Sequence, residues 1–192
     1  SRPFDAERDG LVPSGGAAGL IREELGRARA RGARVYGLLA GYGFSSDGGR
    51  HLTHPEGGGS GRAIRMALAD AHLAPEDIDY INAHATSTPV GDLVEARVIA
   101  EMFGSKVPVS STKSITGHEC WMAGASEALY TVLMARDGFL APNINFSRLD
   151  EGCPPIHVLR AATDCRMRAA LSNSFGFGGT NAALVLDFRD CE

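Results

Sequence analysis

The sequence lacks any apolar run of the roughly 20 residues that a membrane-spanning helix requires, so we expect no such span. It also lacks an excess of basic residues, because its formal net charge is −4. That charge gives no electrostatic basis for nucleic acid or an anionic membrane as a partner. Residues 1–5, Ser-Arg-Pro-Phe-Asp, do not have the character of a signal peptide.

Cysteine is scarce, and the four residues of this type are Cys120, Cys153, Cys165 and Cys191. Their spacing matches neither a zinc site nor a disulfide framework. The chain also lacks internal repeats and low-complexity tracts. We therefore expect a protein of a reducing, cytoplasmic compartment.

What is present indicates a packed protein. Apolar residues make up 44% of the 192 residues, which fits one large domain or part of a bigger protein. The 24 glycines gather at turns and polar loops, where the backbone has to bend sharply or approach a ligand.

One unit organises the chain: an apolar strand, a polar loop and a helix. Residues 78–81 are typical of a buried strand, and residues 93–103 have helical periodicity. Between them, residues 82–92 read Asn-Ala-His-Ala-Thr-Ser-Thr-Pro-Val-Gly-Asp. We predict that Asp92 caps the helix, with Glu95 as the second half of a capping box. Such loops are where open α/β sheets bind ligands.

Similar units follow twice. The second has a strand, a loop and an apolar helix at residues 107–111, 112–119 and 120–136. The third has a strand, a loop and a returning strand at residues 169–171, 172–181 and 182–188. We infer that the three polar loops converge on one site.

The earlier part of the chain supplies further predicted elements. Residues 17–25 are predicted to form a buried strand, and residues 35–42 a second strand that pairs with it. Residues 61–72 have the periodicity of an amphipathic helix, with Ser60 as its cap. The order, βαβαβ followed by extended returns, predicts a layered α/β domain.

The helix predicted at residues 120–136 has little polar face, so we expect it to be buried on nearly every side. Glu127 is then a carboxylate on a buried helix and needs a partner. Lys113 is the candidate partner.

His84 and His118 stand on corresponding loops. A single histidine is most often structural, but imidazole can donate or accept a proton near neutral pH. Two neutral imidazoles aimed at one carbonyl could stabilise an enolate as negative charge develops. The positive charge of Lys113, five residues before His118, would hold both rings neutral. The alternative interpretation of Lys113 is an ordinary surface lysine.

Two alternatives concern the same loops. His84, His118 and Cys120 could ligate a metal, but their spacing fits no zinc pattern. Cys120 near His118 could also be a nucleophile. Because it stands beside Trp121 at the start of the apolar helix, we expect a core thiol instead.

Glycine-rich segments allow further interpretations. His51 and His54 fall in a loop without an acidic helix motif, so we expect a surface loop. Residues 175–179, Phe-Gly-Phe-Gly-Gly, lack the lysine and the following helix of a phosphate loop. Glycines around Phe177 favour a mobile flap, or backbone N–H groups for an oxyanion.

Taken together, the loops resemble the β-ketoacyl-acyl carrier protein synthases, the condensing enzymes of fatty acid and polyketide synthesis in the thiolase-fold superfamily. The motifs that carry the resemblance are Arg-Pro-Phe-Asp at 2–5, Arg-Asp-Gly at 8–10, the loop at 82–92, Lys-Ser-Ile-Thr-Gly-His at 113–118, and Asn-Ser-Phe-Gly-Phe-Gly-Gly-Thr-Asn at 173–181. They occur in the family's order and run through the whole chain. The similarity is greatest to bacterial synthases that elongate acyl chains on a discrete carrier protein. It implies a thiolase-like layered αβα domain, the C-terminal half of an αβαβα fold.

The resemblance also implies a decarboxylative Claisen condensation. His84 and His118 are implied to be the catalytic histidines that hydrogen-bond the malonyl thioester carbonyl. Lys113 and Glu127 match the charged pair that supports them. No cofactor is implied, because the substrate travels on the phosphopantetheine of acyl carrier protein.

Further roles follow from the same resemblance. Thr86 and Thr88 match threonines that hydrogen-bond the pantetheine arm. Phe177, followed by Gly178, matches the gating aromatic whose backbone N–H serves the oxyanion hole. A polar cluster that can hold water or a cation is implied for Asn82, Ser172 and Asn173.

The departures from the family concern both detail and length. Ala85 stands where the family usually has glycine, and residues 119–122 replace small residues, which leaves the acyl chain length open. The family's nucleophilic cysteine lies in an N-terminal half that this sequence does not contain. We expect residues 1–44 to end that half and residues 45–192 to form the C-terminal half.

Two classes of function remain open. The chain is either the C-terminal part of an active synthase, or a non-catalytic partner that binds acyl carrier protein or another synthase subunit. The expected partners of the enzyme are acyl carrier protein, the missing half and a second copy in a homodimer.

Overall fold

The structure is a computed structural model that describes residues 1–49, 53, 55–189 and 191. Its helices are α1 (Leu25–Ala30), α2 (Gly58–Asp70), α3 (Pro89–Phe103), α4 (Lys113–Thr116) and α5 (Ala123–Asp137), with 3-10 helices η1 (Pro75–Asp77) and η2 (Cys120–Met122). Its strands are β1 (Leu38–Ser46), β2 (Tyr80–Asn82), β3 (Pro108–Ser110), β4 (Phe139–Leu140), β5 (His157–Val158), β6 (Thr163–Asp164), β7 (Ala169–Gly176) and β8 (Thr180–Asp187).

Most strands belong to one mixed sheet. Its order is β1-β8-β7-β2-β3-β5, and β4 pairs with β6 separately. β1, β8 and β7 are antiparallel neighbours, whereas β2 runs parallel to β7 and to β3. The carboxyl ends of β2, β3 and β7 therefore meet at one edge of the sheet, which brings the predicted polar segments together.

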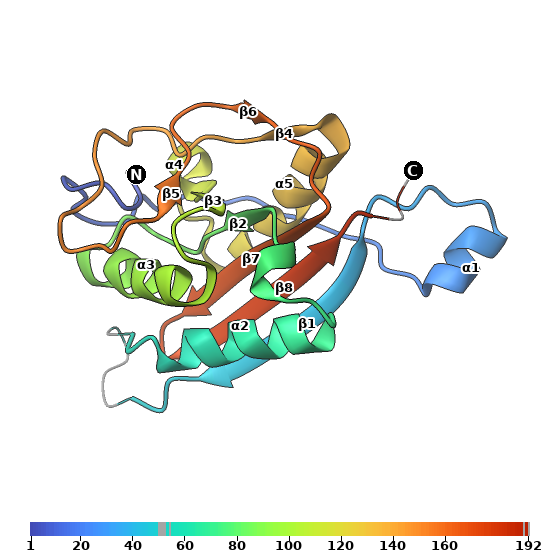
Figure 1. The fold of residues 1–192 in the computed structure, drawn as a ribbon, viewed down its shortest axis with the longest axis horizontal. Helices are drawn as coiled ribbons and strands as arrows, with labels where there is room; N and C mark the ends of the chain where they lie inside the picture. The colour runs from blue at the N-terminus through green and yellow to red at the C-terminus, as the bar shows by residue number, and fades with distance from the viewer. Residues whose placement is uncertain (50–52, 54, 190, 192) are drawn as a thin grey trace.

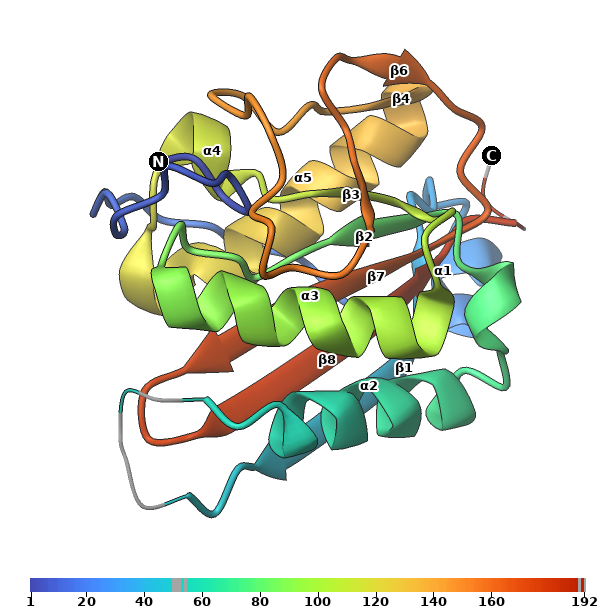
Figure 2. The same cartoon turned by 60° about the vertical axis from the view of Figure 1, so that its left-hand side comes forward.

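Helices cover both faces of this sheet, with α2 and α3 on one face and α5 on the other (Figures 1 and 2). Tyr80 and Ile81 are successive residues of β2, so they point to opposite faces. Ile81 packs in a core cluster with Ile64 and Ile99, and Tyr80 packs in a second cluster with Met134. The layered αβα domain predicted from the sequence is confirmed.

Glycines in β1 let α2 approach the sheet closely. A Cβ at Gly43 would lie 1.8 Å from the carbonyl oxygen of Ala63, and Gly41 is similarly crowded. Tyr42 and Phe44 alternate with these glycines and point to the opposite face, where each is 50% exposed. One face of β1 is thus covered by α2, while the other presents large apolar side chains to solvent.

The strand predicted at residues 17–25 is wrong. Residues 14–24 form neither helix nor strand, and Ile21 is 98% exposed. The pairing predicted between this segment and residues 35–42 is also wrong, because β1 begins at Leu38 and pairs with β8. Within the described residues, the apolar run has no neighbouring strand that would bury it.

The loop predicted at residues 172–181 is wrong as well. β7 continues to Gly176 and β8 begins at Thr180, so only the short turn between them is a loop. Gly178 and Gly179 adopt φ angles of +84° and +76°, which a tight turn requires and glycine permits. Backbone pairing on both sides of β7 outweighs the polar composition of this segment.

Two helix predictions need correction. α2 begins at Gly58, so Ser60 lies inside the helix and does not cap it. α5 is confirmed as a helix, but its burial is one-sided: Glu127, Thr131 and Met134 are buried, whereas several of its apolar residues are only half-buried. The expected burial on every side is therefore wrong for this chain.

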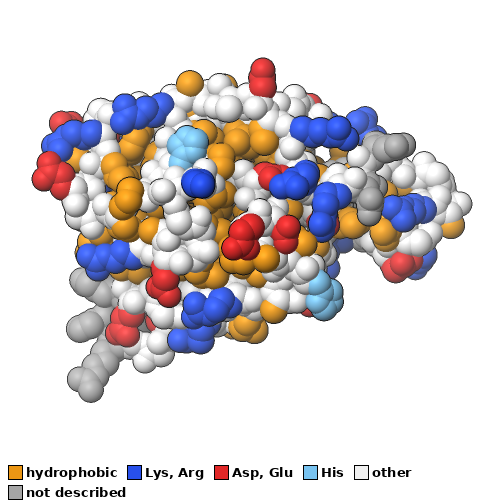
Figure 3. All heavy atoms as spheres, in the orientation of Figure 1, with side chains coloured by type: hydrophobic (Ala, Val, Ile, Leu, Met, Phe, Trp, Pro, Cys, Tyr) orange, Lys and Arg blue, Asp and Glu red, His pale blue; other side chains and the backbone are white. Residues whose placement is uncertain are grey.

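In the part of the chain that the structure describes, no helix is both long and apolar enough to cross a membrane. On the face shown in Figure 3, basic and acidic side chains are interspersed with apolar ones.

Candidate active site

The histidines of the two polar loops face one another. The ring centroids of His84 and His118 are 5.6 Å apart, with an interplanar angle of 84°. The ring of Phe175, near the end of β7, is also 5.6 Å from that of His84. All three side chains line one pocket of about 340 Å³. The predicted convergence of three segments is confirmed, although the third reaches the site as a strand.

A buried carboxylate on α3 holds the backbone around His84. Glu95 is 2% exposed. Its Oε1 accepts hydrogen bonds from the N–H of His84 at 2.9 Å and the side-chain amide of Asn173 at 3.0 Å. Its Oε2 accepts a hydrogen bond from the N–H of Ala85 at 2.7 Å. One side chain thus connects the loop after β2 to β7.

The capping box predicted for Asp92 and Glu95 is wrong. α3 begins at Pro89, because proline at the first helical position has no N–H that needs a partner. Asp92 is buried inside the helix and accepts hydrogen bonds from the N–H groups of Phe4 at 2.8 Å and Thr88 at 3.2 Å. The available signal was the position of both acids on an apolar helix face, where an unpaired carboxylate is costly.

Replacing Glu95 with alanine is expected to lower the free energy of unfolding by roughly 3 kcal/mol or more, because two buried donors and one part-buried donor lose their acceptor. Urea denaturation measures this loss. The matched control is Glu101→Ala, at an exposed position of the same helix. Equal stability losses in both variants would show that the Glu95 contacts are unimportant.

The geometry of His118 determines its tautomer. Its Nδ1 accepts a hydrogen bond from the N–H of Cys120 at 3.2 Å, so the neutral ring carries its proton on Nε2. Its backbone is held by the N-terminal segment, through the carbonyl of Val12 at 2.7 Å and the N–H of Ser14 at 2.9 Å. His118 is therefore positioned as a neutral hydrogen-bond donor.

Burial and charge keep both imidazoles neutral. Burial lowers the pKa of His84 well below its usual value, and the charge of Lys113 and the neighbouring ring of His118 lower it further. Burial also lowers the pKa of His118, where Lys113 acts in the same direction and Glu119 opposes it. Both rings can thus donate a hydrogen bond without carrying a charge.

The predicted partnership of Lys113 and Glu127 is present. Each residue is 1% exposed, and Lys113 Nζ forms an ion pair with Glu127 Oε1. Burial raises the pKa of Glu127 to about 7, although the charge of Lys113 opposes this shift. Lys113 therefore lies beneath the histidines as a buried cation whose counterion comes from α5.

Glu119 is a second acid beside the site, and sequence reasoning assigned it no role. Its Oε1 accepts a hydrogen bond from the hydroxyl of Tyr130 at 3.0 Å. This contact holds the carboxylate next to His118, where it counteracts the effect of Lys113 on the pKa of that ring.

The two threonines lie on the pocket wall. The hydroxyl oxygens of Thr86 and Thr88 are 3.1 Å apart, and both residues line the pocket. Arg8, whose role sequence reasoning missed, donates hydrogen bonds to the carbonyls of Thr88 at 3.2 Å and Pro89 at 2.7 Å. It also forms an ion pair with Asp150 at 2.5 Å. The N-terminal segment thereby fixes the loop that presents the threonines.

The proposed polar cluster is buried beneath the histidines. Asn82 and Asn173 are 0% exposed and Ser172 is 3% exposed, and β2 places Asn82 opposite Ser172 on β7. At this site, three buried polar atoms have no hydrogen-bond partner among the described residues: His84 Nδ1, Glu127 Oε2 and Asn173 Oδ1. The cluster therefore has unused capacity to bind a small polar species.

Phe177 occupies the turn between β7 and β8. Its side chain is 77% exposed and lines the pocket, and Gly178 follows it with a left-handed backbone. Its place at the pocket mouth fits a movable cover. The gating and oxyanion roles stay predictions.

Cys120 is exposed, so the expected core thiol is wrong. The helix α5 begins only at Ala123, and the preceding 3-10 turn directs Trp121 fully into solvent, at 102% exposure. The Sγ of Cys120 lies 3.5 Å from the carbonyl oxygen of His118. The thiol is thus accessible and close to one histidine.

Metal ligation was the other alternative for these loops. The described residues contain no group of three or more His, Cys, Asp or Glu side chains arranged to hold a metal ion. His51 and His54 lie outside the described residues.

Comparisons with known proteins point to one family. The family described as "Beta-ketoacyl synthase, C-terminal domain" matches residues 36–147. The 3-oxoacyl-[acyl-carrier-protein] synthase 1 of Escherichia coli is 47% identical over 187 residues, which cover 97% of this chain and 45% of that protein. The 3-oxoacyl-[acyl-carrier-protein] synthase 2 of Coxiella burnetii is 47% identical over 191 residues, covering 97% and 46%. The chain thus spans about half the length of these relatives.

Solved structures show the same relationship. A β-ketoacyl synthase from Burkholderia phymatum has a TM-score of 0.88 at 38% identity, over 97% of this chain and 46% of that one. The ishigamide ketosynthase/chain length factor has a TM-score of 0.91 at 39% identity, over 97% and 46%. On the strength of its histidine pair, the family match and these relatives, the chain belongs to the β-ketoacyl synthase family.

Proposed function

We propose that the full-length protein containing this chain is a β-ketoacyl-acyl carrier protein synthase, and that this chain supplies the residues that activate malonyl. The observation that carries the proposal is the pair of neutral rings, His84 and His118, with centroids 5.6 Å apart at one pocket. Two preorganised donors can stabilise negative charge on an oxygen placed between them.

In the proposed reaction, malonyl on acyl carrier protein loses CO2, and the electrons of the broken C–C bond form an enolate. His84 and His118 stabilise the enolate oxygen by hydrogen bonds. The enolate carbon attacks the acyl thioester held on a cysteine of the missing half. The carbonyl re-forms as the cysteine thiolate leaves, which gives a β-ketoacyl thioester.

The remaining site residues serve this reaction in the proposal. Thr86 and Thr88 hydrogen-bond the pantetheine arm, which their place on the pocket wall supports. Phe177, with Gly178, moves as a gate and provides a backbone N–H to the oxyanion. Water or a cation occupies the cluster of Asn82, Ser172 and Asn173.

Exposed apolar surface supports a missing N-terminal half as a partner. Ile21 and Trp121 are 98% and 102% exposed, and Tyr42 and Phe44 are 50% exposed. Large apolar side chains that are exposed in this way mark interaction surfaces. We therefore propose that the N-terminal half ends within residues 1–44, before β1, that it packs on the α5 side of the sheet, and that it contributes the reactive cysteine.

The test is an assay with acyl- and malonyl-acyl carrier protein. The full-length protein is expected to form β-ketoacyl product, whereas residues 1–192 alone are expected to form none, because condensation needs a thiolate that holds the acyl group in place. Product from residues 1–192 that is lost on Cys120→Ser would overturn this proposal and make Cys120 the nucleophile.

A non-catalytic subunit is the second candidate, and one of the similar structures is a ketosynthase/chain length factor. The neutral histidine pair and Lys113 favour the enzyme, since a binding subunit does not require them. A full-length protein without a reactive cysteine would favour the subunit. For the enzyme, we propose a cytoplasmic homodimer that receives its substrates from acyl carrier protein.

A further inference from the structure

A second pocket, of about 520 Å³, lies at the opposite end of the sheet from the histidines. Its lining includes Met167 and Arg168, just before β7, and Phe188, just after β8. Phe175 and Gly176, at the other end of β7, line the histidine pocket. Because eight residues of extended strand span roughly 25 Å, the two pockets are separate.

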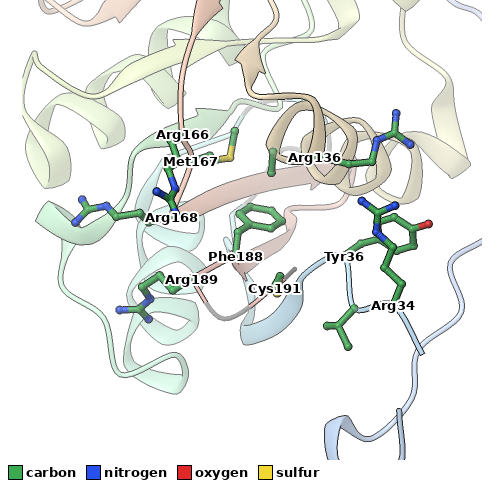
Figure 4. Close-up of a pocket in the computed structure, with 11 residues that line it drawn as sticks. Arg34, Tyr36, Arg136, Arg166, Met167, Arg168, Phe188, Arg189 and Cys191 are labelled. Carbon is green, nitrogen blue, oxygen red and sulfur yellow. The ribbon is translucent and has the colours of Figure 1, made fainter. Parts of the chain in front are cut away.

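Arginines gather around this second pocket although the chain has a net charge of −4. The five that line it are Arg34, Arg136, Arg166, Arg168 and Arg189. Arg34 and Arg136 lie on one side of Phe188, and the other three lie on the opposite side (Figure 4). Basic side chains also gather around the C-terminus on the face shown in Figure 3. Like charges so close together favour binding of an anion.

Neighbouring acids balance only part of this charge. The ion pairs are Arg136 with Asp137, Arg168 with Asp79 and Arg189 with Asp187. Arg34 and Arg166 form no ion pair with any residue that the structure describes. The guanidinium of Arg34 lies 4.9 Å from the ring centroid of Tyr36, which restricts its position. Two guanidinium groups at this pocket therefore have no counterion among the residues that the structure describes.

The pocket also has an apolar floor. Phe188 is 9% exposed and Met167 is 5% exposed, whereas Tyr36 at the rim is 49% exposed.

Guanidinium binds phosphate oxygens through two parallel hydrogen bonds. We propose that this pocket binds a small organic phosphate, whose phosphate contacts Arg34 and Arg166 and whose apolar body packs on Phe188 and Met167.

Isothermal titration of the full-length protein with phenyl phosphate and with inorganic phosphate tests the proposal. Phenyl phosphate is expected to bind roughly tenfold more tightly or better, since burying a phenyl ring adds that much affinity. Arg34→Ala and Arg166→Ala are each expected to weaken phenyl phosphate binding by about tenfold, through loss of a charge-assisted contact. Arg65→Ala, at an exposed position of α2, is the matched control and should bind unchanged.

Three outcomes would overturn the proposal. They are no saturable binding at millimolar phenyl phosphate, binding that both pocket variants retain, and equal affinity for phenyl phosphate and inorganic phosphate. Absence of saturable binding is also the result expected if the rest of the full-length protein fills the pocket, and it overturns the proposal in that case too. Because Arg34 and Arg166 are exposed, both variants should keep the wild-type midpoint of urea denaturation, which reports that they fold. This test succeeds or fails independently of the proposed condensation.

Discussion

The His118→Ala variant of the full-length protein is expected to decarboxylate malonyl-acyl carrier protein roughly 100- to 1,000-fold more slowly, the usual cost of removing one donor to a developing oxyanion. The Nδ1 of His118 is occupied by the N–H of Cys120, so only Nε2 can reach the substrate. Transfer of an acyl group onto the cysteine creates no enolate, and this half-reaction should continue. Release of labelled CO2 and acyl loading, measured in parallel, separate the two steps.

His157→Ala provides the control for this experiment. His157 is an exposed residue of β5, outside the lining of the histidine pocket. Its variant should decarboxylate malonyl at the wild-type rate. A His118→Ala variant that also decarboxylates normally would show that His118 does not act on the malonyl group.

Lys113→Met is expected to have the largest effect on stability, with a loss of about 3–5 kcal/mol in the free energy of unfolding, because it leaves a buried carboxylate without its counterion. Glu127 would then carry an uncompensated charge at 1% exposure. Burial already raises the pKa of Glu127, and loss of Lys113 raises it further. A carboxyl whose pKa is higher in the folded protein loses stability as the pH rises through that value. The variant should therefore be least stable at alkaline pH.

The double variant Lys113→Met, Glu127→Met tests this explanation. Removing both members of a buried pair is often nearly neutral, whereas removing one is strongly destabilising. Urea denaturation should therefore show that the double variant is more stable than Lys113→Met alone. A double variant that loses stability additively would exclude an uncompensated charge as the cause.

Lys113→Met should also move the pH dependence of activity. The charge of Lys113 lowers the pKa of both His84 and His118, so its removal raises them. More of the enzyme then carries imidazolium near neutral pH, and the acid limb of the pH–rate profile shifts to higher pH. Glu119→Gln should shift this limb to lower pH, because Glu119 raises the pKa of His118. Histidine titration by NMR measures both shifts, and shifts in the same direction would contradict the assignment.

Several helices, and several residues that line the histidine pocket, were predictable from the sequence. Apolar spacing indicated the helices that became α3 and α5, because helix periodicity is a local property. His84 and His118 were identified because each follows a strand that could be recognised from its apolar run. The start of α3 was misplaced, since Pro89 at the first helical position was not recognised and Asp92 was taken as the cap.

Strands were less predictable, because a strand depends on its neighbours. Residues 17–25 have a strand-like composition, but they are exposed and unpaired within the described chain. Residues 172–176 have a loop-like composition, yet they form part of β7 between β2 and β8. Composition indicates what a segment could form, and the availability of pairing partners decides what it does form.

The residue types in the pocket, their order along the chain and the Lys113–Glu127 pair follow from the amino-acid sequence. Three further features depend on the fold: Glu95 holds the backbone of His84, the proton of neutral His118 lies on Nε2, and Cys120 is exposed. Residue type follows from the sequence directly, whereas burial, hydrogen-bond partners and pKa shifts depend on groups that only the folded sheet brings together.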